Sequence, residues 1–227
     1  MTQKAVLITG GARRIGAALA RIFAADGYDI ALHYNHSADE AAALMLEMGA
    51  KLYQADLTAP DATKNLIQAV KADFPHLNTL INNASTFRRA HLQESTEASI
   101  HEDIAINLSA PLNLMREFTA HTEQGSIINM LDIAIHDTHP AHFAYLIAKK
   151  GLAEATKMAA REYDGEIRVN GICPGHVLPT ENTNAHEPTV IAENPPTVQQ
   201  VVETALLLAN DRAYNGELLN IDGSELS

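Results

Sequence analysis

The sequence predicts a single α/β domain spanning residues 1–227, in which helices cover both faces of a doubly wound, mainly parallel sheet of seven strands. Three observations predict it. Strand-like apolar segments alternate with segments of helical periodicity along nearly the whole chain. A glycine turn, residues 9–16, separates the first strand from the first helix. Polar motifs follow several strands directly, as expected where parallel strands end at a ligand-binding edge.

The first strand is expected at residues 5–8, an apolar run, and the first helix begins inside the glycine turn and ends before Gly27. The other strands are expected at 28–34, 51–55, 79–81, 126–131, 167–172 and 218–221. The other helices are expected at 38–48, 60–72, 96–122, 142–163 and 197–209. We expect the helix at 96–122 to bend near Pro111, since proline cannot donate a helical N–H. Right-handed crossovers between these elements produce the doubly wound sheet.

Composition limits the classes of function. The chain has 227 residues and is 46% hydrophobic, which suffices for one large core. It contains no secretion signal and no apolar run long enough to cross a membrane, and its single cysteine, Cys173, suits a reducing cytoplasm. The net charge of −12 makes nucleic acid and anionic membranes poor partners. An anionic cofactor would bind against this overall charge, so arginines close to it matter more.

The glycine turn from Thr9 to Gly16 reads TGGARRIG. A strand, a glycine turn and a helix N-terminus form a dinucleotide-binding unit, because glycine lets the backbone approach the pyrophosphate and the helix offers free N–H groups. The spacing is T-G-x-x-x-R-x-G rather than the common G-x-G-x-x-G. Arg14 stands where many related motifs carry a second glycine.

The end of the second strand favours NADP(H) over NAD. Sites for NAD usually place a carboxylate after this strand, but residues 33–37 read HYNHS and the first acid is Asp39. Asn35 and Ser37 can bond a 2′-phosphate, and Arg14 or His36 can pair with it. We interpret His33 as a residue that only finishes the strand.

Two further strand ends carry polar residues. Asp56, after the third strand, either accepts a hydrogen bond from the adenine amino group or caps the next turn, and the sequence favours neither. Residues 82–84 read NNA and bring amide and small side chains next to the expected ribose, so a purely structural turn is the less favoured interpretation.

Tyr145 and Lys149 lie four residues apart and share one helix face. An ammonium about 4 Å from a phenol, at an effective dielectric constant of 20, stabilises the phenolate by ~4 kcal/mol, or roughly three pKa units. We therefore expect the pKa of Tyr145 to move from about 10 toward neutrality, with desolvation opposing part of the shift. Such a phenol can exchange a proton at physiological pH.

Together these motifs resemble the short-chain dehydrogenase/reductase family over nearly the whole chain. The resemblance rests on the glycine turn, Asp56, the NNA motif, Asn107, the Tyr145/Lys149 pair and the Pro174-Gly175 dipeptide. It implies a Rossmann domain, a nicotinamide cofactor, a homotetramer built through two long helices, and catalytic roles for Asn107, Tyr145 and Lys149. The family's fourth catalytic residue, usually serine thirteen residues before the tyrosine, is Asp132 here.

Asp132 changes the chemistry that the site can support. In carbonyl reduction the serine donates a hydrogen bond to the oxygen that becomes an alkoxide, whereas an ionised carboxylate cannot donate and repels that charge. Asp132 fits a substrate that presents N–H groups, or one whose ring nitrogen is protonated as hydride arrives. A pterin has both. The alternative interpretation is a damaged site.

The sequence resembles the pteridine reductases in particular. That resemblance rests on the arginine of the glycine turn, on HYNHS at 33–37, on NNASTF at 82–87 and on NMLD at 129–132. It implies that Phe87 stacks on the pterin, that Arg14 contacts phosphate and pterin, and that Ser85 bonds a cofactor phosphate or the pterin. The alternative for Phe87 is a turn residue folded onto the core.

The resemblance also assigns roles in the reaction. Tyr145 supplies the proton, Lys149 holds the nicotinamide ribose, and Asp132 orients the substrate and joins the proton relay. Asn107 positions a water connected to Lys149. The expected substrate-binding residues are Arg14, Ser85, Phe87, Asp132 and Tyr145. The expected cofactor-binding residues are Gly10, Arg13, Arg14, Ile15, Tyr34, Asn35, His36, Ser37, Asp56, Leu57, Asn83, Ala84, Ser85, Lys149, Pro174 and Gly175.

Some residues depart from the family pattern or suggest other chemistry. His36 stands where these reductases usually have an arginine, which weakens the preference for NADP or makes it pH-dependent. The loop after Gly175 is short and polar, so we expect an open pocket. His136, His139 and His142 have a spacing that could suggest zinc, but Pro140 interrupts any helix between them, and no metal is expected. Cys173 is interpreted as a packed residue rather than a nucleophile.

The leading hypothesis is therefore an NADPH-dependent reductase of a dihydropterin or dihydrofolate-like ring. A second is a general carbonyl or 3-oxoacyl reductase in which Asp132 is tolerated. A third is a non-catalytic protein that senses the cofactor, which the intact Tyr145/Lys149 pair disfavours because a sensor needs no tuned phenol.

Overall fold

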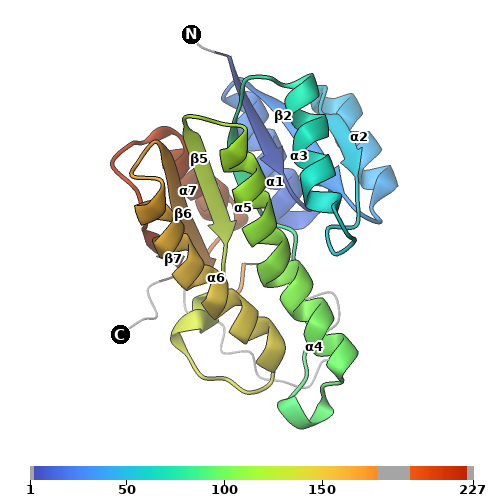
Figure 1. Ribbon diagram of the computed structural model, residues 1–227, viewed down its shortest axis with the longest axis vertical. Coiled ribbons are helices and arrows are strands. Elements are labelled where there is room, and N and C mark those ends of the chain that lie inside the picture. The colour runs from blue at the N-terminus through green and yellow to red at the C-terminus, as the bar shows by residue number, and fades with distance from the viewer. Residues whose placement is uncertain (1–2, 178–194, 224–227) are drawn as a thin grey trace.

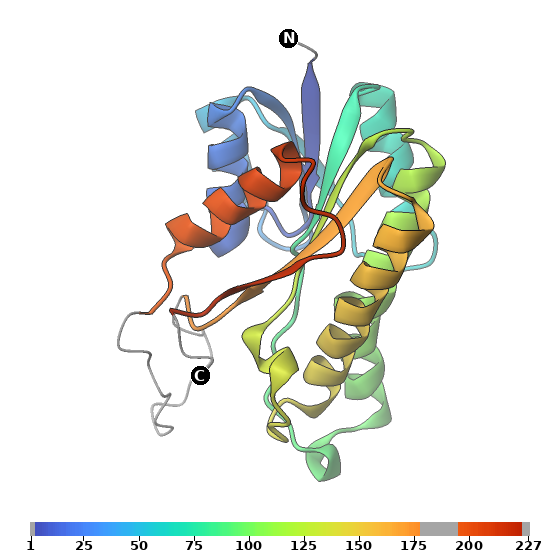
Figure 2. The ribbon, with the colours of Figure 1, turned by 90° about the vertical axis from the view of Figure 1, so that its left-hand side faces the viewer.

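The fold is a parallel sheet between two layers of helices (Figures 1 and 2). A computed structural model describes residues 3–177 and 195–223. The seven strands of the sheet lie in the order β3-β2-β1-β4-β5-β6-β7 and pair in parallel. Their bounds are β1 Lys4–Ile8, β2 Tyr28–Tyr34, β3 Lys51–Gln54, β4 Leu77–Asn82, β5 Gly125–Met130, β6 Ile167–Pro174 and β7 Leu218–Ile221.

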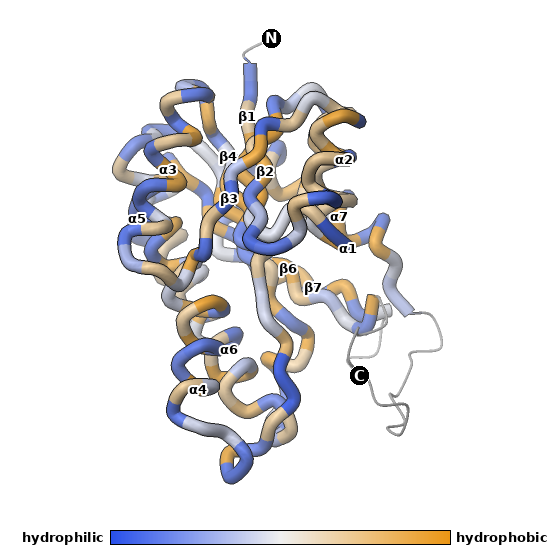
Figure 3. Tube along the Cα trace, turned by 90° about the vertical axis from the view of Figure 1, so that its right-hand side faces the viewer, coloured by the Kyte–Doolittle hydropathy of each residue, from blue (hydrophilic) through white to orange (hydrophobic). Residues whose placement is uncertain are grey.

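Two helical layers bury the two faces of the sheet. The helices are α1 Arg14–Ala25, α2 Ala38–Met48, α3 Ala62–Asp73, α4 Glu97–Ile104, α5 Ala110–Ala120, α6 Phe143–Glu162 and α7 Val198–Asn210. Helices α1, α2 and α7 pack in one apolar cluster and α3, α5 and α6 in the other. Along β1, Ala5 and Leu7 face the second cluster while Val6 and Ile8 face the first, as a strand buried on both faces requires. Figure 3 shows hydrophilic and hydrophobic residues alternating along the helices.

The strand order reverses between β1 and β4, because β2 and β3 continue to one side of β1 whereas β4 to β7 continue to the other. The carboxyl ends of strands at such a switch point form a crevice that commonly binds ligands. Figure 1 shows that α4 and the loop leading into α6 extend beyond the carboxyl ends of the strands. The expected alternation of elements and the doubly wound sheet are confirmed.

The segment predicted as one bent helix, 96–122, differs in detail from the expectation. Helix α4 ends at Ile104, a π-helical turn follows at Ala105–Ser109, and α5 begins at Ala110 with Pro111 in its first turn. The irregularity thus lies just before the proline. Pro111 lacks the N–H that would pair with the carbonyl of Asn107 in an α-helix, and its ring would collide with that carbonyl, so the preceding turn widens.

A buried polar chain joins the end of β4 to β5 and α6. The side-chain amide of Asn82 donates to Asn129 at 2.8 Å, and the amide of Asn129 donates to the Thr156 hydroxyl at 2.9 Å. These three residues are almost fully buried, so their mutual hydrogen bonds offset the cost of leaving water. The chain fixes the register of β4 immediately before the polar motif that follows it. Among the described helices, none is both long and apolar enough to cross a membrane.

Candidate active site

The glycine turn between β1 and α1 needs its glycines for backbone geometry and for space. Gly10 has a φ of +59°, and a Cβ there would lie 2.9 Å from the Cα of Ala84. A Cβ on Gly16 would overlap the carbonyl oxygen of Gly10, so α1 packs directly on the turn. Arg14 also has a positive φ, +54°, which is unusual for a residue with a side chain. The glycine common at this position in related motifs would adopt that conformation without strain.

The N-terminus of α1 is suited to an anion. Arg13 is the N-cap residue, and its side chain makes no capping hydrogen bond to the first turn. The first amides of the helix therefore have no side-chain acceptor at the cap, and the helix dipole adds partial positive charge there. A turn with glycine at positions 10, 11 and 16, at a helix end without a side-chain cap, fits the pyrophosphate of a dinucleotide. Arg14 and Ile15 begin the helix beside this cradle.

The turn is fastened to the end of β4 across the switch point. The Asn83 amide donates to the carbonyl oxygens of Thr9 and Gly10 at 2.9 and 3.0 Å, and the Thr9 hydroxyl accepts from the backbone N–H groups of Asn83 and Ala84 at 3.0 Å each. Asn83 therefore has a structural role in shaping the turn. Its expected contact with the cofactor, like that of Ala84, stays a prediction.

His33 fastens the same turn from β2. The backbone N–H of Gly10 lies 3.2 Å from Nδ1 of His33, and Nε2 lies 3.0 Å from the carbonyl oxygen of Ala55. A carbonyl only accepts, so Nε2 carries the hydrogen and Nδ1 is the acceptor. Burial lowers the pKa of His33, which keeps the ring neutral. His33 thus does more than finish a strand, since it joins the glycine turn to the end of β3.

The residues after β2 lie beside Arg13. Glu40, in the first turn of α2, pairs with the Arg13 guanidinium at 3.6 Å, with both side chains about half exposed. Such a surface pair has little strength, so Arg13 can exchange it for a phosphate. His36 is exposed and Ser37 is the N-cap residue of α2. Tyr34 and Asn35 lead into this segment at the end of the strand.

Asp56 caps the turn that follows β3, which is one of the two roles expected for it. Its Oδ1 atom accepts from the backbone N–H and the hydroxyl of Thr58, at 2.9 and 2.7 Å. These hydrogen bonds lower the pKa of the Asp56 carboxyl. The side chain is exposed, and its contact with adenine stays a prediction. The next residue, Leu57, packs its side chain in the apolar core, so only its backbone faces the crevice.

Asp132 and Tyr145 are in direct contact. The Tyr145 hydroxyl donates to Oδ2 of Asp132 at 2.6 Å, while Oδ1 accepts from the backbone N–H of Ala134 at 2.8 Å. Asp132 follows β5 and caps the 3₁₀ turn at Ile133–His136, whereas Tyr145 is in the first turn of α6. Both carboxylate oxygens are therefore fixed, one by the backbone and one by the phenol.

Lys149 lies one turn further along α6. Its Nζ atom donates to the carbonyl oxygen of Met130 at 2.7 Å and lies 5.8 Å from the centre of the Tyr145 ring. Lys149 is almost completely buried, and burial lowers its pKa to about 8 while the nearby Asp132 opposes the shift.

The expectation that Lys149 brings the Tyr145 phenol toward neutrality is wrong for this arrangement. Burial, with the charge and hydrogen bond of Asp132 in addition, raises the pKa of Tyr145 well above its ordinary value. The ammonium lies over the ring and bonds Met130, whereas the carboxylate contacts the hydroxyl itself. Because the phenol is buried and the nearer charge is negative, the pKa of Tyr145 is raised and the phenol is a protonated donor at neutral pH.

Asn107 lies in the π turn and holds the segment after β4. Its amide donates to the carbonyl oxygens of Thr86 and Asp103, both at 3.1 Å, and its Oδ1 accepts from the Ser85 hydroxyl at 2.6 Å. The side chain is fully buried and reaches the 85–86 segment rather than Lys149. Its expected connection to Lys149 through a water stays a prediction.

Phe87 lies at the mouth of the site rather than in the core. Its ring is 46% exposed, and it belongs to neither apolar cluster. It meets the Tyr145 ring edge-on, with centroids 4.9 Å apart and an interplanar angle of 89°. The alternative of a turn residue folded onto the core is thereby excluded, and stacking on a substrate stays a prediction.

The end of β6 carries the last expected residues. Gly175 donates its N–H to Ile221 at 2.8 Å, directly after Pro174. Cys173 is fully buried, and burial raises its thiol pKa to about 12, so it is a packed residue as expected. The expectation of an open pocket concerns the loop at residues 176–182, of which 178–182 lie outside the described residues. Within the described ranges, no three His, Cys, Asp or Glu side chains are arranged to hold a metal ion.

Two residues that lie near the site were not predicted from the sequence to be part of it. The buried Asp103 accepts from the Thr86 hydroxyl at 3.2 Å, and its four-residue spacing from Asn107 was a signal that could have found it. His142 stacks on Phe87, and its position three residues before Tyr145 on the same helix face was a comparable signal.

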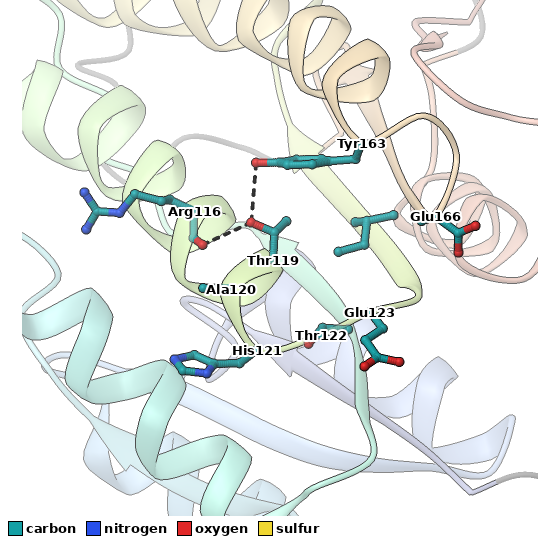
Figure 4. Close-up of a pocket in the computed structure, with 9 residues that line it drawn as sticks. Arg116, Thr119, Ala120, His121, Thr122, Glu123, Tyr163 and Glu166 are labelled. Atoms are coloured by element: carbon teal, nitrogen blue, oxygen red, sulfur yellow. Dashed lines mark hydrogen bonds between the residues drawn. The ribbon is translucent and has the colours of Figure 1, made fainter.

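A cavity of about 770 Å³ lies far from this site. It is formed by the end of α5, the loop that leads to β5, the residues that follow α6 and the start of β6, at the opposite end of the sheet from Asp132 and Tyr145. Within it the Thr119 hydroxyl donates to the Arg116 carbonyl oxygen and lies 3.4 Å from the Tyr163 hydroxyl, which can donate to it (Figure 4). It contains none of the expected site residues.

Comparisons with known proteins agree with this geometry. A family model described as short chain dehydrogenase matches residues 4–190. The chain is 29% identical to the 3-oxoacyl-[acyl-carrier-protein] reductase FabG of Staphylococcus epidermidis, over 97% of this chain and 98% of that protein. It is 32% identical to the acetoacetyl-CoA reductase of Rhizobium meliloti, over 77% of this chain and 74% of that protein.

Two solved structures are similar along nearly the whole chain. The FolM alternative dihydrofolate reductase 1 of Brucella canis, complexed with NADP, has a TM-score of 0.91 and 27% identity, covering 99% of this chain and 94% of that one. A blue fluorescent protein from a metagenomic library, in complex with NADPH, has a TM-score of 0.90 and 28% identity, covering 99% and 98%.

The contacts of His33 predict acid-sensitive stability. Because burial lowers its folded-state pKa, the unfolded chain binds the proton more tightly. The contribution of His33 to the free energy of unfolding is therefore complete above about pH 6.5, the usual histidine pKa. It is lost as pH falls through the pKa of His33 in the folded protein. Each pKa unit of depression corresponds to about 1.4 kcal/mol.

Urea unfolding of the wild type and of His33→Gln between pH 8 and pH 5 measures this effect. The glutamine variant does not titrate in this range, so its free energy of unfolding should fall less steeply below about pH 6.5. Equal slopes for the two proteins would contradict the assignment.

Proposed function

The chain belongs to the short chain dehydrogenase family, and we propose that it is an NADPH-dependent reductase of a dihydropterin or dihydrofolate-like ring. The observation that carries this proposal is the 2.6 Å hydrogen bond from Tyr145 to Asp132. A carboxylate stands where the family usually places a hydroxyl donor. The resemblance of the fold to a dihydrofolate reductase complexed with NADP supports the proposal.

The glycine turn and the segments around it support NADP(H) as the cofactor, as do similar structures that are complexes with NADP or NADPH. Reduced nicotinamide supplies hydride when bound. The N-terminus of α1 and Arg14 would hold the pyrophosphate, and Arg13, His36 and Ser37 would hold the 2′-phosphate. Lys149 would hold the nicotinamide ribose beside Tyr145.

The remaining chemistry belongs to Asp132 and Tyr145. A C=N bond that gains hydride on carbon must gain a proton on nitrogen. Tyr145 is a protonated phenol next to the reacting edge and would donate that proton, and the Lys149 ammonium would stabilise the resulting phenolate. Asp132 would accept a hydrogen bond from an N–H group of the ring, which fixes the orientation of the substrate. A proton from solvent, relayed through the Asp132 carboxylate, would then restore the phenol.

A second candidate function is reduction of a 3-oxoacyl thioester. The specific observation in its favour is the similarity to FabG along 97% of the chain. Against it stands Asp132, because a carboxylate at this position cannot donate to a developing alkoxide and repels it. Tyr145 alone would then have to stabilise the oxygen of the reacting carbonyl. Its hydroxyl, however, already donates to the Asp132 carboxylate.

The assembly and the compartment are part of the proposal. We propose a homotetramer formed through α5 and α6, which carry exposed apolar side chains at Leu112, Ile147 and Met158. The free thiol of Cys173 suits a reducing cytoplasm.

The substrate is tested by following NADPH oxidation with dihydrobiopterin, dihydromonapterin and dihydrofolate beside an acetoacetyl thioester. Pterin turnover should fall by about 10²- to 10⁴-fold in Tyr145→Phe, because the proton donor is removed. It should also fall in Asp132→Ala and Asp132→Ser, and the serine variant should gain thioester reduction because it restores a donor to the oxyanion.

Turnover of the thioester alone, rising in Asp132→Ser, would establish the second candidate instead. Tight binding of NADPH without turnover of any substrate would contradict both and favour a cofactor sensor.

The buried Lys149 predicts an alkaline limit to cofactor use. Its pKa of about 8 means that the ammonium loses its proton as pH rises through that value. Because kcat/KM for NADPH reports groups of the free enzyme, it should decline above about pH 8. Arginine keeps its charge over this pH range. In Lys149→Arg, kcat/KM for NADPH should therefore be lower overall but should not decline above about pH 8. If kcat/KM of the arginine variant still declines above about pH 8, another group causes the decline.

A further inference from the structure

We propose that His142 is a positioning residue that holds the Phe87 ring against Tyr145 and so makes the site selective for flat aromatic substrates. The inference deepens the proposed function, on which its substrate selectivity rests. It assigns a role to one of the three histidines whose spacing had suggested a metal, although the described residues form no metal cluster.

The first observation is the stack itself. The rings of His142 and Phe87 lie with centroids 4.2 Å apart and planes inclined by 21°. Phe87 meets Tyr145 edge-on at 4.9 Å, and His142 meets Tyr145 at 6.4 Å with an angle of 71°. Such offset and edge-to-face pairs are the favourable aromatic geometries. His142 therefore covers one face of Phe87, and the Phe87 and Tyr145 rings stand perpendicular to each other.

The second observation is that His142 is fixed independently of Phe87. Its Nδ1–H donates to the carbonyl oxygen of Arg88 at 2.9 Å, since a carbonyl can only accept. The neighbouring backbone is bonded as well: Ala90 donates to Ala141 at 2.8 Å and accepts from Phe143 at 3.2 Å. The histidine ring thus joins the loop after β4 to the start of α6, three residues before Tyr145.

The third observation is that the backbone around Phe87 is held without contact to its ring. Thr86 bonds Asn107 and Asp103, and Arg88 pairs with Glu102 and Asp103. Phe87 itself is 46% exposed. A half-exposed ring on a loop would otherwise exchange between rotamers. His142 removes that freedom, so the ring stands ready as a wall over Tyr145.

Two substitutions separate the ring of His142 from its hydrogen bond. His142→Asn keeps a donor close to the position of Nδ1 but has no ring, whereas His142→Phe keeps a stacking ring but has no donor. His139→Asn is the matched control, because its ring lies 6.5 Å from that of His142 in a tilted arrangement and has no stacking contact with Phe87.

The asparagine variant should raise KM for the dihydropterin by about 3- to 10-fold, which corresponds to the value of one aromatic pair. Its kcat and its affinity for NADPH should change little. The phenylalanine variant and the His139→Asn control should resemble the wild type in their KM for the dihydropterin. A purely structural role would instead lower kcat and cofactor affinity together.

A double-mutant cycle with Phe87→Leu tests whether His142 acts through Phe87. In that background His142→Asn should cause no further rise in KM, because the ring that it positions is gone. Equal effects in both backgrounds would overturn the proposal.

A substrate-free measurement keeps the inference separate from the identity of the substrate. The chain has five phenylalanines, so fluorine NMR of protein labelled with fluorophenylalanine gives few signals, and Phe87→Leu identifies the one from Phe87. That signal should shift in His142→Asn and not in His139→Asn. An unchanged signal would overturn the inference, whereas a shift without pterin turnover would leave the positioning role intact and contradict only the substrate.

Discussion

The hydrogen bond from the Tyr145 hydroxyl to the Asp132 carboxylate joins the first turn of α6 to the end of β5. The second carboxylate oxygen of Asp132 is fixed by the Ala134 N–H. Lys149, one turn along α6 from the phenol, is bonded to the carbonyl oxygen of Met130. Burial, with the charge of the carboxylate in addition, keeps the phenol protonated, and the carboxylate accepts its hydrogen bond. A carboxylate repels an alkoxide and accepts from N–H groups, so we propose that this one interaction sets the class of substrate.

The parallel sheet brings this contact next to the dinucleotide turn. The end of β1 is fastened to β4 by Thr9 and Asn83 and to β3 through His33, and the end of β4 continues into the segment that carries Phe87. The chain is strongly acidic overall, with a net charge of −12, so we propose that this turn, the helix N-terminus and Arg13 attract the phosphates locally. The glycine turn and the segment that carries Phe87 are consequently held by one set of hydrogen bonds.

The order of elements and the location of the motifs could be predicted because local patterns determine them. The run before Thr9, the helical spacing of Tyr145 and Lys149, and the proline at 111 all act within a few residues. The pKa of Tyr145 could not be predicted in the same way, because it depends on the burial of the phenol and on which charge lies nearer to the hydroxyl. The partners of Asn107 and the stack of His142 on Phe87 also join segments distant in the sequence. Spacing along one helix contains no information on such contacts.

The protonation of Tyr145 is the most direct test of this account. The chain has six tyrosines, so carbon NMR of protein labelled at the tyrosine Cζ follows each phenol as pH rises, and Tyr145→Phe identifies the relevant signal. The account predicts that Tyr145 stays protonated beyond pH 10, about the ordinary tyrosine pKa, and that it titrates at lower pH in Asp132→Asn. Titration of Tyr145 near neutrality in the wild type would contradict it, since the ammonium of Lys149 would then outweigh the carboxylate.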